Sequence, residues 1–224
     1  MFSEGLTATK VFNTGVFLMA SPTLLKRSTY PIVDWKNARG KTAEIVVFPP
    51  EASLTKGTFL WRLSSATVTE AGPFSAFPGY ERYLALVEGK GLRLQFANGG
   101  RVLNVKPGEV CQFSGDEPIS CELPAGKIAD LNLIVQKSTV KAEFKIITLP
   151  LKPRSFSLEG KCGFVFGVSG TVVASVYPGE TKFQIQEGDT LRVDCPENDP
   201  EGERLILLEP GKGDCQVALI ELDW

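Results

Sequence analysis

The chain has 224 residues, a hydrophobic content of 43% and a formal net charge of −2, all ordinary values for a globular protein. With 24 Lys and Arg against 26 Asp and Glu, we expect no basic surface for nucleic acid or for an anionic membrane. No run approaches the roughly 18–20 apolar residues that a membrane span needs. We therefore predict a cytoplasmic protein with no nucleic-acid partner and no membrane partner.

Histidine is absent from the chain, which removes the usual imidazole base, the Ser-His and Cys-His couples and the commonest transition-metal ligand. The five cysteines lack CxxC or other metal-ligand spacing and are interpreted as separate reduced thiols. We expect no metal, no cofactor and no catalytic residue of these types. The cysteines are Cys111, Cys121, Cys162, Cys195 and Cys215.

The first 28 residues are weakly patterned, and we predict a weakly structured extension over residues 1–28, with Met19 as an alternative start. The first clear strand is Thr42–Phe48, which Pro49-Pro50 ends because proline cannot donate to a sheet ladder. Further short strands follow, separated by Gly and Pro turns, and no long helical periodicity is present. This pattern predicts an all-β sandwich or barrel.

Residues 59–96 are the most informative stretch and read as three strands with a turn-rich loop. In the first strand Arg62, Ser64 and Ala66 share one face, because alternate residues of a strand point the same way. The loop Gly72–Gly79 contains two Gly, two Pro and two Phe, so it has fixed turns and rings to bury. An arginine on a face of small residues beside an aromatic loop predicts a pocket that the arginine and the aromatic rings line.

The second part of the chain repeats the turn pattern of the first. Gly89 is matched by Gly170 at an offset of 81 residues, and Gly108 by Gly188 at an offset of 80. We interpret this as two related antiparallel barrels, over residues 29–150 and 151–224. The second unit is shorter and is expected to lack the strand equivalent to 61–68, so its predicted role is packing or homodimerisation.

Several sequence words, in order, resemble the HutD/Ves family of bicupin proteins in the cupin superfamily. This resemblance implies two cupin-like, jelly-roll barrels and a link to histidine utilisation or stress response. It also implies a regulatory, small-molecule-binding role without established enzymatic activity. The words are Trp35-Lys36-Asn37, Glu44-Ile45, Trp61–Val68, Gly72–Gly79, Arg82, Leu84, Phe113–Asp116 and Asp130–Asn132.

Arg62 is the leading candidate for ligand contact. A buried guanidinium must be paired, either with an internal carboxylate or with an incoming anion. Glu44, Glu88 and Asp130 are available as internal partners, so a structural ion pair is the alternative. Arg82 is a second candidate cation at the pocket mouth, and for Arg82 a salt bridge that braces the loop is slightly favoured.

Four further residues complete the predicted ligand site together with Ser64. Asp130 and Asn132 alternate with leucines, so both point the same way, as ligand contacts or as satisfied core groups. Trp35 and Phe77, with Phe74, are more readily interpreted as loop anchors than as a ligand platform.

Two functions remain open at this point. The first is a non-enzymatic protein that binds a small carboxylate metabolite; the family resemblance points to histidine-degradation intermediates such as formylglutamate or urocanate. The second is a metal-independent cupin enzyme, an isomerase or lyase, with Glu44 or Asp130 as base and Arg62 as electrostatic stabiliser. Turnover of a candidate ligand would favour the second function.

Overall fold

A computed structural model describes residues 22–224, except for 36, 53–56, 180 and 196–203. The described chain is all-β, with one short 3₁₀ helix, η1 (Arg27–Thr29). The strands form four sheets, and every pairing of two strands is antiparallel. The expected start at Met19 and most of the predicted extension fall on residues 1–21, outside the described residues.

The first half of the chain contains a six-stranded and a four-stranded sheet. In spatial order, the larger sheet contains β2 (Ile32–Asp34), β3 (Gly40–Phe48), β4 (Trp61–Val68), β11 (Ile128–Gln136), β6 (Tyr80–Glu88) and β9 (Val110–Ser114). The smaller contains β5 (Gly72–Pro73), β10 (Ile119–Glu122), β7 (Leu92–Phe96) and β8 (Val102–Val105). Together they form the first sandwich.

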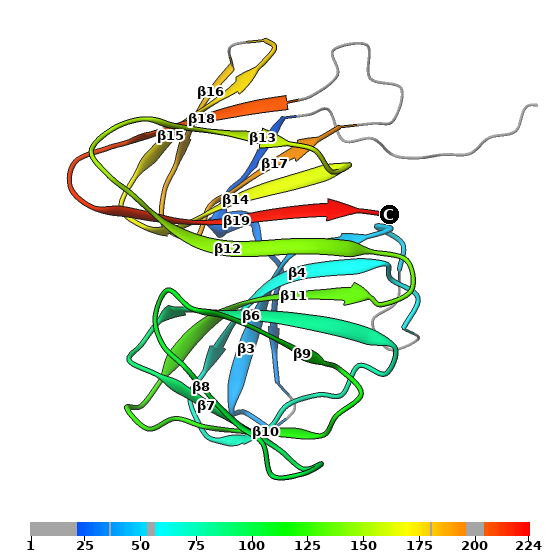
Figure 1. Ribbon diagram of the computed structural model, residues 1–224. Helices are drawn as coiled ribbons and strands as arrows, with labels where there is room; N and C mark the ends of the chain where they lie inside the picture. Colours follow the sequence, from blue (N-terminus) through cyan, green and yellow to red (C-terminus); the bar gives the residue numbers. More distant parts are fainter. Residues whose placement is uncertain (1–21, 36, 53–56, 180, 196–203) are drawn as a thin grey trace, which may run out of the picture.

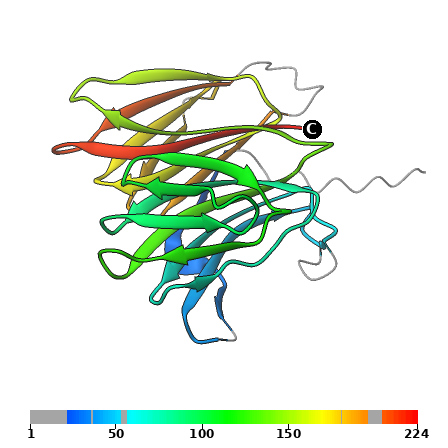
Figure 2. The ribbon, with the colours of Figure 1, turned by 60° about the horizontal axis from the view of Figure 1, so that its bottom comes forward.

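The second half repeats this arrangement as a second sandwich. Its larger sheet contains β1 (Thr23–Leu25), β17 (Thr190–Asp194), β14 (Cys162–Ser169), β19 (Cys215–Asp223) and β12 (Lys141–Leu149). Its smaller sheet contains β13 (Arg154–Leu158), β18 (Arg204–Pro210), β15 (Val172–Tyr177) and β16 (Thr181–Ile185). Figures 1 and 2 show the two sandwiches stacked on each other.

The strand orders confirm the predicted internal repeat. The order β4-β11-β6-β9 of the first sandwich corresponds to β12-β19-β14-β17 of the second, and β5-β10-β7-β8 corresponds to β13-β18-β15-β16. Gly89 and Gly170 follow equivalent strands, and both have positive φ angles, 107° and 74°, which glycine tolerates. The sheets within each sandwich are not joined into closed barrels.

Two features differ from the sequence-based division of the chain. β12 precedes residue 150, yet it lies at the edge of the second sandwich and is the equivalent of β4. The expectation that the second unit lacks this strand is therefore wrong. In addition, β1 pairs with β17, and Lys26 reaches Asp189 at 2.8 Å, so residues 23–29 are an ordered part of the second sandwich.

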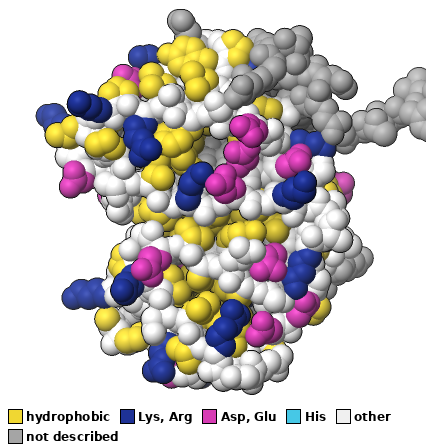
Figure 3. All heavy atoms as spheres, viewed as in Figure 1, with side chains coloured by type: hydrophobic (Ala, Val, Ile, Leu, Met, Phe, Trp, Pro, Cys, Tyr) yellow, Lys and Arg dark blue, Asp and Glu magenta, His cyan; other side chains and the backbone are white. Residues whose placement is uncertain are grey.

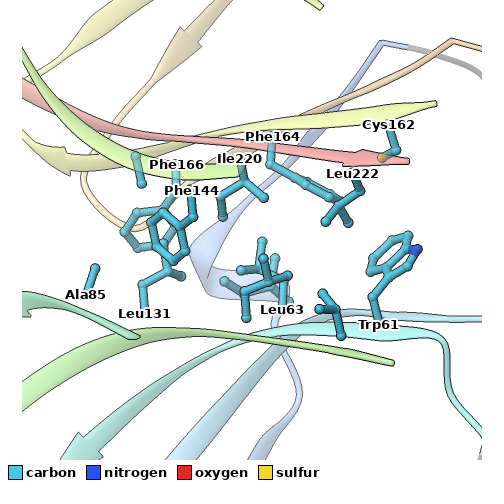
Figure 4. Close-up of a cluster of buried hydrophobic side chains, with 14 of the residues drawn as sticks. Trp61, Leu63, Ala85, Leu131, Phe144, Cys162, Phe164, Phe166, Ile220 and Leu222 are labelled. Carbon is cyan, nitrogen blue, oxygen red and sulfur yellow. The ribbon is translucent and has the colours of Figure 1, made fainter. Parts of the chain in front are cut away.

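The largest core lies between the two sandwiches, where their larger sheets face each other. Figure 4 shows Trp61, Leu63 and Leu131 pointing up from the first sandwich toward Phe164 and Ile220 of the second. Strand alternation explains this: residues 61, 63 and 65 of β4 face the partner sandwich, while residues 62, 64, 66 and 68 face the interior of their own. The four sheets thus stack as layers.

No helix among the described residues has the length and apolar character required to cross a membrane. On the face shown in Figure 3, basic and acidic side chains are interspersed.

Candidate functional site

A cavity of about 540 Å³ lies inside the first sandwich. Strands β4, β11 and β6 form its floor, and the segments around 33–37 and 73–77 form its walls. All seven residues predicted for the ligand site line this single cavity. They are Trp35, Arg62, Ser64, Phe77, Arg82, Asp130 and Asn132.

The strand register explains why these residues meet. Ile134 of β11 stands opposite Arg62 of β4 on one side and Arg82 of β6 on the other, so the two arginines share one row across the sheet. Two residues further along β11, Asn132 stands opposite Ser64. Alternation then places these residues and Asp130 on the same face, with the cavity above them.

Arg82 is the most unusual residue in the cavity. Its side chain is only 4% exposed, and Nη1 donates to the carbonyl oxygen of Ser75 at 3.2 Å, but the buried Nε has no hydrogen-bond partner among the described residues. No carboxylate of the described residues lies within 4.0 Å of its guanidinium. The expected loop-bracing salt bridge of Arg82 is therefore not among the described contacts.

Three aromatic rings surround the Arg82 guanidinium. Its central carbon lies 5.4 Å from the ring centres of Phe74 and Phe77 and 5.1 Å from that of Phe113. These distances are typical of cation–π contacts, which offset part of the cost of burying the charge. Burial nevertheless dominates and lowers the pKa of Arg82 to about 10. The guanidinium stays charged near neutral pH, and the phenylalanines act as a collar around it.

Asp130 and Asn132 form the polar part of the floor. Asp130 is 1% exposed and Asn132 is 8% exposed, and in each the Oδ1 oxygen is buried without a hydrogen-bond partner among the described residues. Burial raises the pKa of Asp130 to about 7, and the nearby positive charge of Arg82 only partly opposes this rise. The cavity therefore contains acceptor oxygens that no described residue satisfies.

Arg62 forms the internal ion pair that the sequence offered as the alternative to ligand contact. Its Nε donates to Oε2 of Glu44 at 3.1 Å, and the Arg62 side chain is 11% exposed. Glu44 faces the same way because it stands opposite Ser64 in the register of β3 and β4. The structure thus assigns the internal ion pair to Arg62, whereas Arg82 forms no ion pair with a carboxylate of the described residues.

The remaining walls contain residues that sequence reasoning treated differently or missed. Trp35 donates from Nε1 to Oγ1 of Thr42 at 2.8 Å, which fixes the indole at the edge of the cavity. Phe74 and Phe77 do anchor the loop, but they do so around Arg82. Phe113 belongs to a motif of the family resemblance, but its contact with Arg82 was not predicted, because it lies on β9 and no local pattern connects it with Arg82.

The corresponding position in the second sandwich has different chemistry. The row that contains Arg62, Ile134 and Arg82 corresponds to the row of Glu143, Glu221 and Gly163. A Cβ atom at Gly163 would lie only 2.6 Å from a methyl carbon of Leu158, so an arginine has no room there. Among the described residues, the row of the second sandwich that is equivalent to the two arginines therefore contains no arginine.

The described residues contain no group of three or more His, Cys, Asp and Glu side chains arranged to hold a metal ion. The two arginines and the unpartnered oxygens instead suit an organic ligand. The prediction of a site without metal or cofactor stays a prediction.

A family model described as HutD matches residues 27–207, most of the chain and both sandwiches. The chain belongs to the HutD family. An uncharacterized 21.2 kDa protein in the hutC 3′ region of Pseudomonas putida is 36% identical to this HutD chain over 127 residues. That match covers 57% of this chain and 65% of the relative, slightly less than two thirds of its length. The family is associated with histidine-utilisation genes.

Solved structures agree with this family assignment. A conserved protein of unknown function from Pseudomonas aeruginosa PAO1 has a TM-score of 0.81 and 27% identity, covering 92% of the HutD chain and 100% of that protein. HutD from Pseudomonas fluorescens SBW25, in a formate condition, has a TM-score of 0.74 and 28% identity, with coverages of 91% and 98%. Vicilin from Solanum melongena has 9% identity and a TM-score of 0.62, and the match covers 88% of this chain and 83% of the vicilin chain. At this identity the match shows a shared fold alone.

Proposed function

We propose that this HutD-family protein is a cytoplasmic, non-enzymatic binding protein for a small carboxylate metabolite, with a regulatory role in histidine utilisation or stress response. Each sandwich then corresponds to one cupin-like barrel, and the first holds the ligand. The histidine-utilisation context of the relatives favours formylglutamate or urocanate as the metabolite. The cavity, at about 540 Å³, is large enough for molecules of this size.

One observation carries the proposal: Arg82 is a buried cation, and none of the described carboxylates, Asp130 included, lies within 4.0 Å of its guanidinium. A buried charge is costly unless it is paired. A ligand carboxylate would supply the missing charge and could accept two parallel hydrogen bonds from the guanidinium, the strongest geometry available to an arginine. Ser64 and Arg62 border the same space and would complete the anion-binding wall.

The test compares ligand affinity and stability in Arg82→Gln, Arg82→Lys and the wild type. Truncating one partner of a buried pair costs on the order of 2–5 kcal/mol, so Arg82→Gln should weaken carboxylate binding by about 30-fold or more. Arg82→Lys keeps the positive charge but loses the planar guanidinium that can donate two parallel hydrogen bonds. Its carboxylate affinity should therefore lie between those of the wild type and Arg82→Gln. Because Arg82 has no internal carboxylate to release, the melting temperature of the unliganded variants should change little.

Arg93→Gln is the matched control, because Arg93 is an exposed arginine of β7 outside the cavity. Titration calorimetry with formylglutamate, urocanate and simple carboxylates provides the affinities. Unchanged carboxylate affinity in Arg82→Gln, or no carboxylate binding by the wild type, would refute the proposed site.

A second function is favoured by the state of Asp130. A carboxyl group with a pKa of about 7 beside a cation is suited to general acid–base catalysis near neutral pH. Glu44, the other candidate base, is instead engaged by Arg62. A metal-independent isomerase or lyase would convert its bound carboxylate and lose that conversion in Asp130→Asn. Saturable binding without conversion supports the binding function.

A further inference from the structure

The floor of the cavity has a cationic end at Arg82 and a separate group of acceptor oxygens at Asp130 and Asn132. Arg82 stands opposite Ile134, whereas Asp130 lies four residues earlier on the same strand. At about 3.3 Å per residue, the backbone positions of the two rows are about 13 Å apart along the strand, while the charged groups of Arg82 and Asp130 are close enough to shift each other's pKa. The side chains from both rows border the same cavity, so a ligand that contacts Arg82 has room to reach toward Asn132 and Asp130 as well.

The orphaned polar atoms of the described residues concentrate here. Five buried side-chain atoms have no hydrogen-bond partner in the described part of the chain, and three of them belong to residues of this cavity: Arg82 Nε, Asp130 Oδ1 and Asn132 Oδ1. Buried polar groups are satisfied in the great majority of cases, so a cluster of exceptions in one cavity indicates a missing partner. The first of the three is a donor and the other two are acceptors.

A carboxylate satisfies only the donor. It has no hydrogen to donate, so it leaves both acceptor oxygens unmatched. A hydroxyl group donates one hydrogen, which is one too few for two acceptors. A nitrogen with two or more hydrogens donates to both, and Asn132 and Asp130 are placed to share it because they are two residues apart on one face of β11.

We propose, on the basis of the carboxylate-binding function above, that the cavity selects ligands with both a carboxylate and an amino-type nitrogen, the carboxylate toward Arg82 and the N–H groups toward Asp130 and Asn132. The buried position of Asp130 fits this orientation, because donated hydrogen bonds favour its ionised form and offset the burial that raises its pKa. The ligand class is therefore a compact amino acid or related amino carboxylate, which disfavours formylglutamate and urocanate because each offers only one N–H group.

Matched probes test this inference without knowledge of the natural ligand. Propionate, butyrate and valerate are each compared with their terminal hydroxy and terminal amino derivatives by titration calorimetry. For the chain length that fits, the amino member should bind wild-type protein at least tenfold more tightly than the unsubstituted acid, which corresponds to about 1.4 kcal/mol. The hydroxy member should fall between them.

Asn132→Leu removes one acceptor and should reduce the amino preference to about threefold or less, while the unsubstituted acid binds at least as well as before. Ser175→Ala is the matched control, because Ser175 also has a buried, unpartnered oxygen but lies on β15 of the second sandwich. It should leave the preference intact.

The outcomes separate this inference from the function on which it rests. Equal affinity for the amino and unsubstituted acids, with binding still lost in Arg82→Gln, would overturn the amino selectivity and leave the carboxylate function standing. Hydroxy derivatives that bind as tightly as amino ones would overturn the assignment to nitrogen. If wild-type protein binds none of the carboxylates, the proposed function itself fails.

Discussion

Replacing Asp130 with asparagine should make the protein more stable at neutral pH, contrary to the usual effect of altering a buried polar residue. Burial raises the pKa of Asp130 from 3.8 to about 7 in the folded protein. Well below pH 3.8 the group is protonated in both the folded and unfolded states and has no effect on stability. As pH rises through this interval, the unfolded chain releases its proton first, so the free energy of unfolding falls.

The structure sets the size of this effect. The interval between 3.8 and about 7, at 1.36 kcal/mol per pKa unit, gives an upper bound of about 4 kcal/mol. This loss should be complete above about pH 7. Asparagine has a similar shape but no charge to bury, so its own hydrogen-bond mismatch adds an offset that does not vary with pH.

Urea unfolding at a series of pH values from 4 to 8, followed by tryptophan fluorescence, measures the effect. We expect the variant to gain stability relative to the wild type from pH 4 to about pH 7 and to show no further gain above that. Asp116→Asn is the control, because Lys137 and the backbone N–H of Gly79 lower the pKa of this exposed carboxyl to about 2. Its stabilising contribution is present above pH 4 and is lost only in more acidic solution.

A stability difference between wild type and Asp130→Asn that stays constant from pH 4 to 8 would refute the reasoning. It would mean that Asp130 titrates normally in the folded protein and is not confined to a dry cavity floor.

Three further predictions follow from other parts of the structure. Arg62→Ala should lower the free energy of unfolding, and a double-mutant cycle with Glu44→Gln should give a coupling of about 1–3 kcal/mol; a coupling near zero would contradict the ion pair. Gly89→Ala should lower the free energy of unfolding by about 1–3 kcal/mol, because the new Cβ would lie 2.7 Å from Ile128. Gly99→Ala is the control and should have a smaller effect in urea unfolding, because a Cβ at Gly99 would meet nothing within 4 Å. Calorimetry should give one bound carboxylate per chain, and two would show that the second sandwich also binds.

The sequence was sufficient to predict how residues share faces. The alternation of Arg62, Ser64 and Ala66, and of Asp130 and Asn132, is local information, and the structure places all five on the floor of one cavity. The internal repeat was also readable, because tight turns with positive φ require glycine at fixed places.

The sequence could not predict the sheet to which each strand belongs. Lys141–Leu149 is recognisable as a strand, but its pairing with β19 depends on residues more than 60 positions away. The sequence left open which arginine pairs with an internal carboxylate, for the same reason. Glu44 reaches Arg62 from the neighbouring strand, whereas the rings around Arg82 come from two loop positions and from Phe113 on β9. Only the assembled sheet reveals which cation is without an anion.

The pairing of β1 with β17 has a consequence for synthesis of the chain. Lys26 and its partner Asp189 are 163 residues apart in sequence, so the first strand leaves the ribosome long before its partner exists. At about 5–20 residues per second this delay is on the order of 10–30 s. During that time the edge that β1 later occupies has not yet been made, so the second sandwich is completed by a segment synthesised well before most of its other strands.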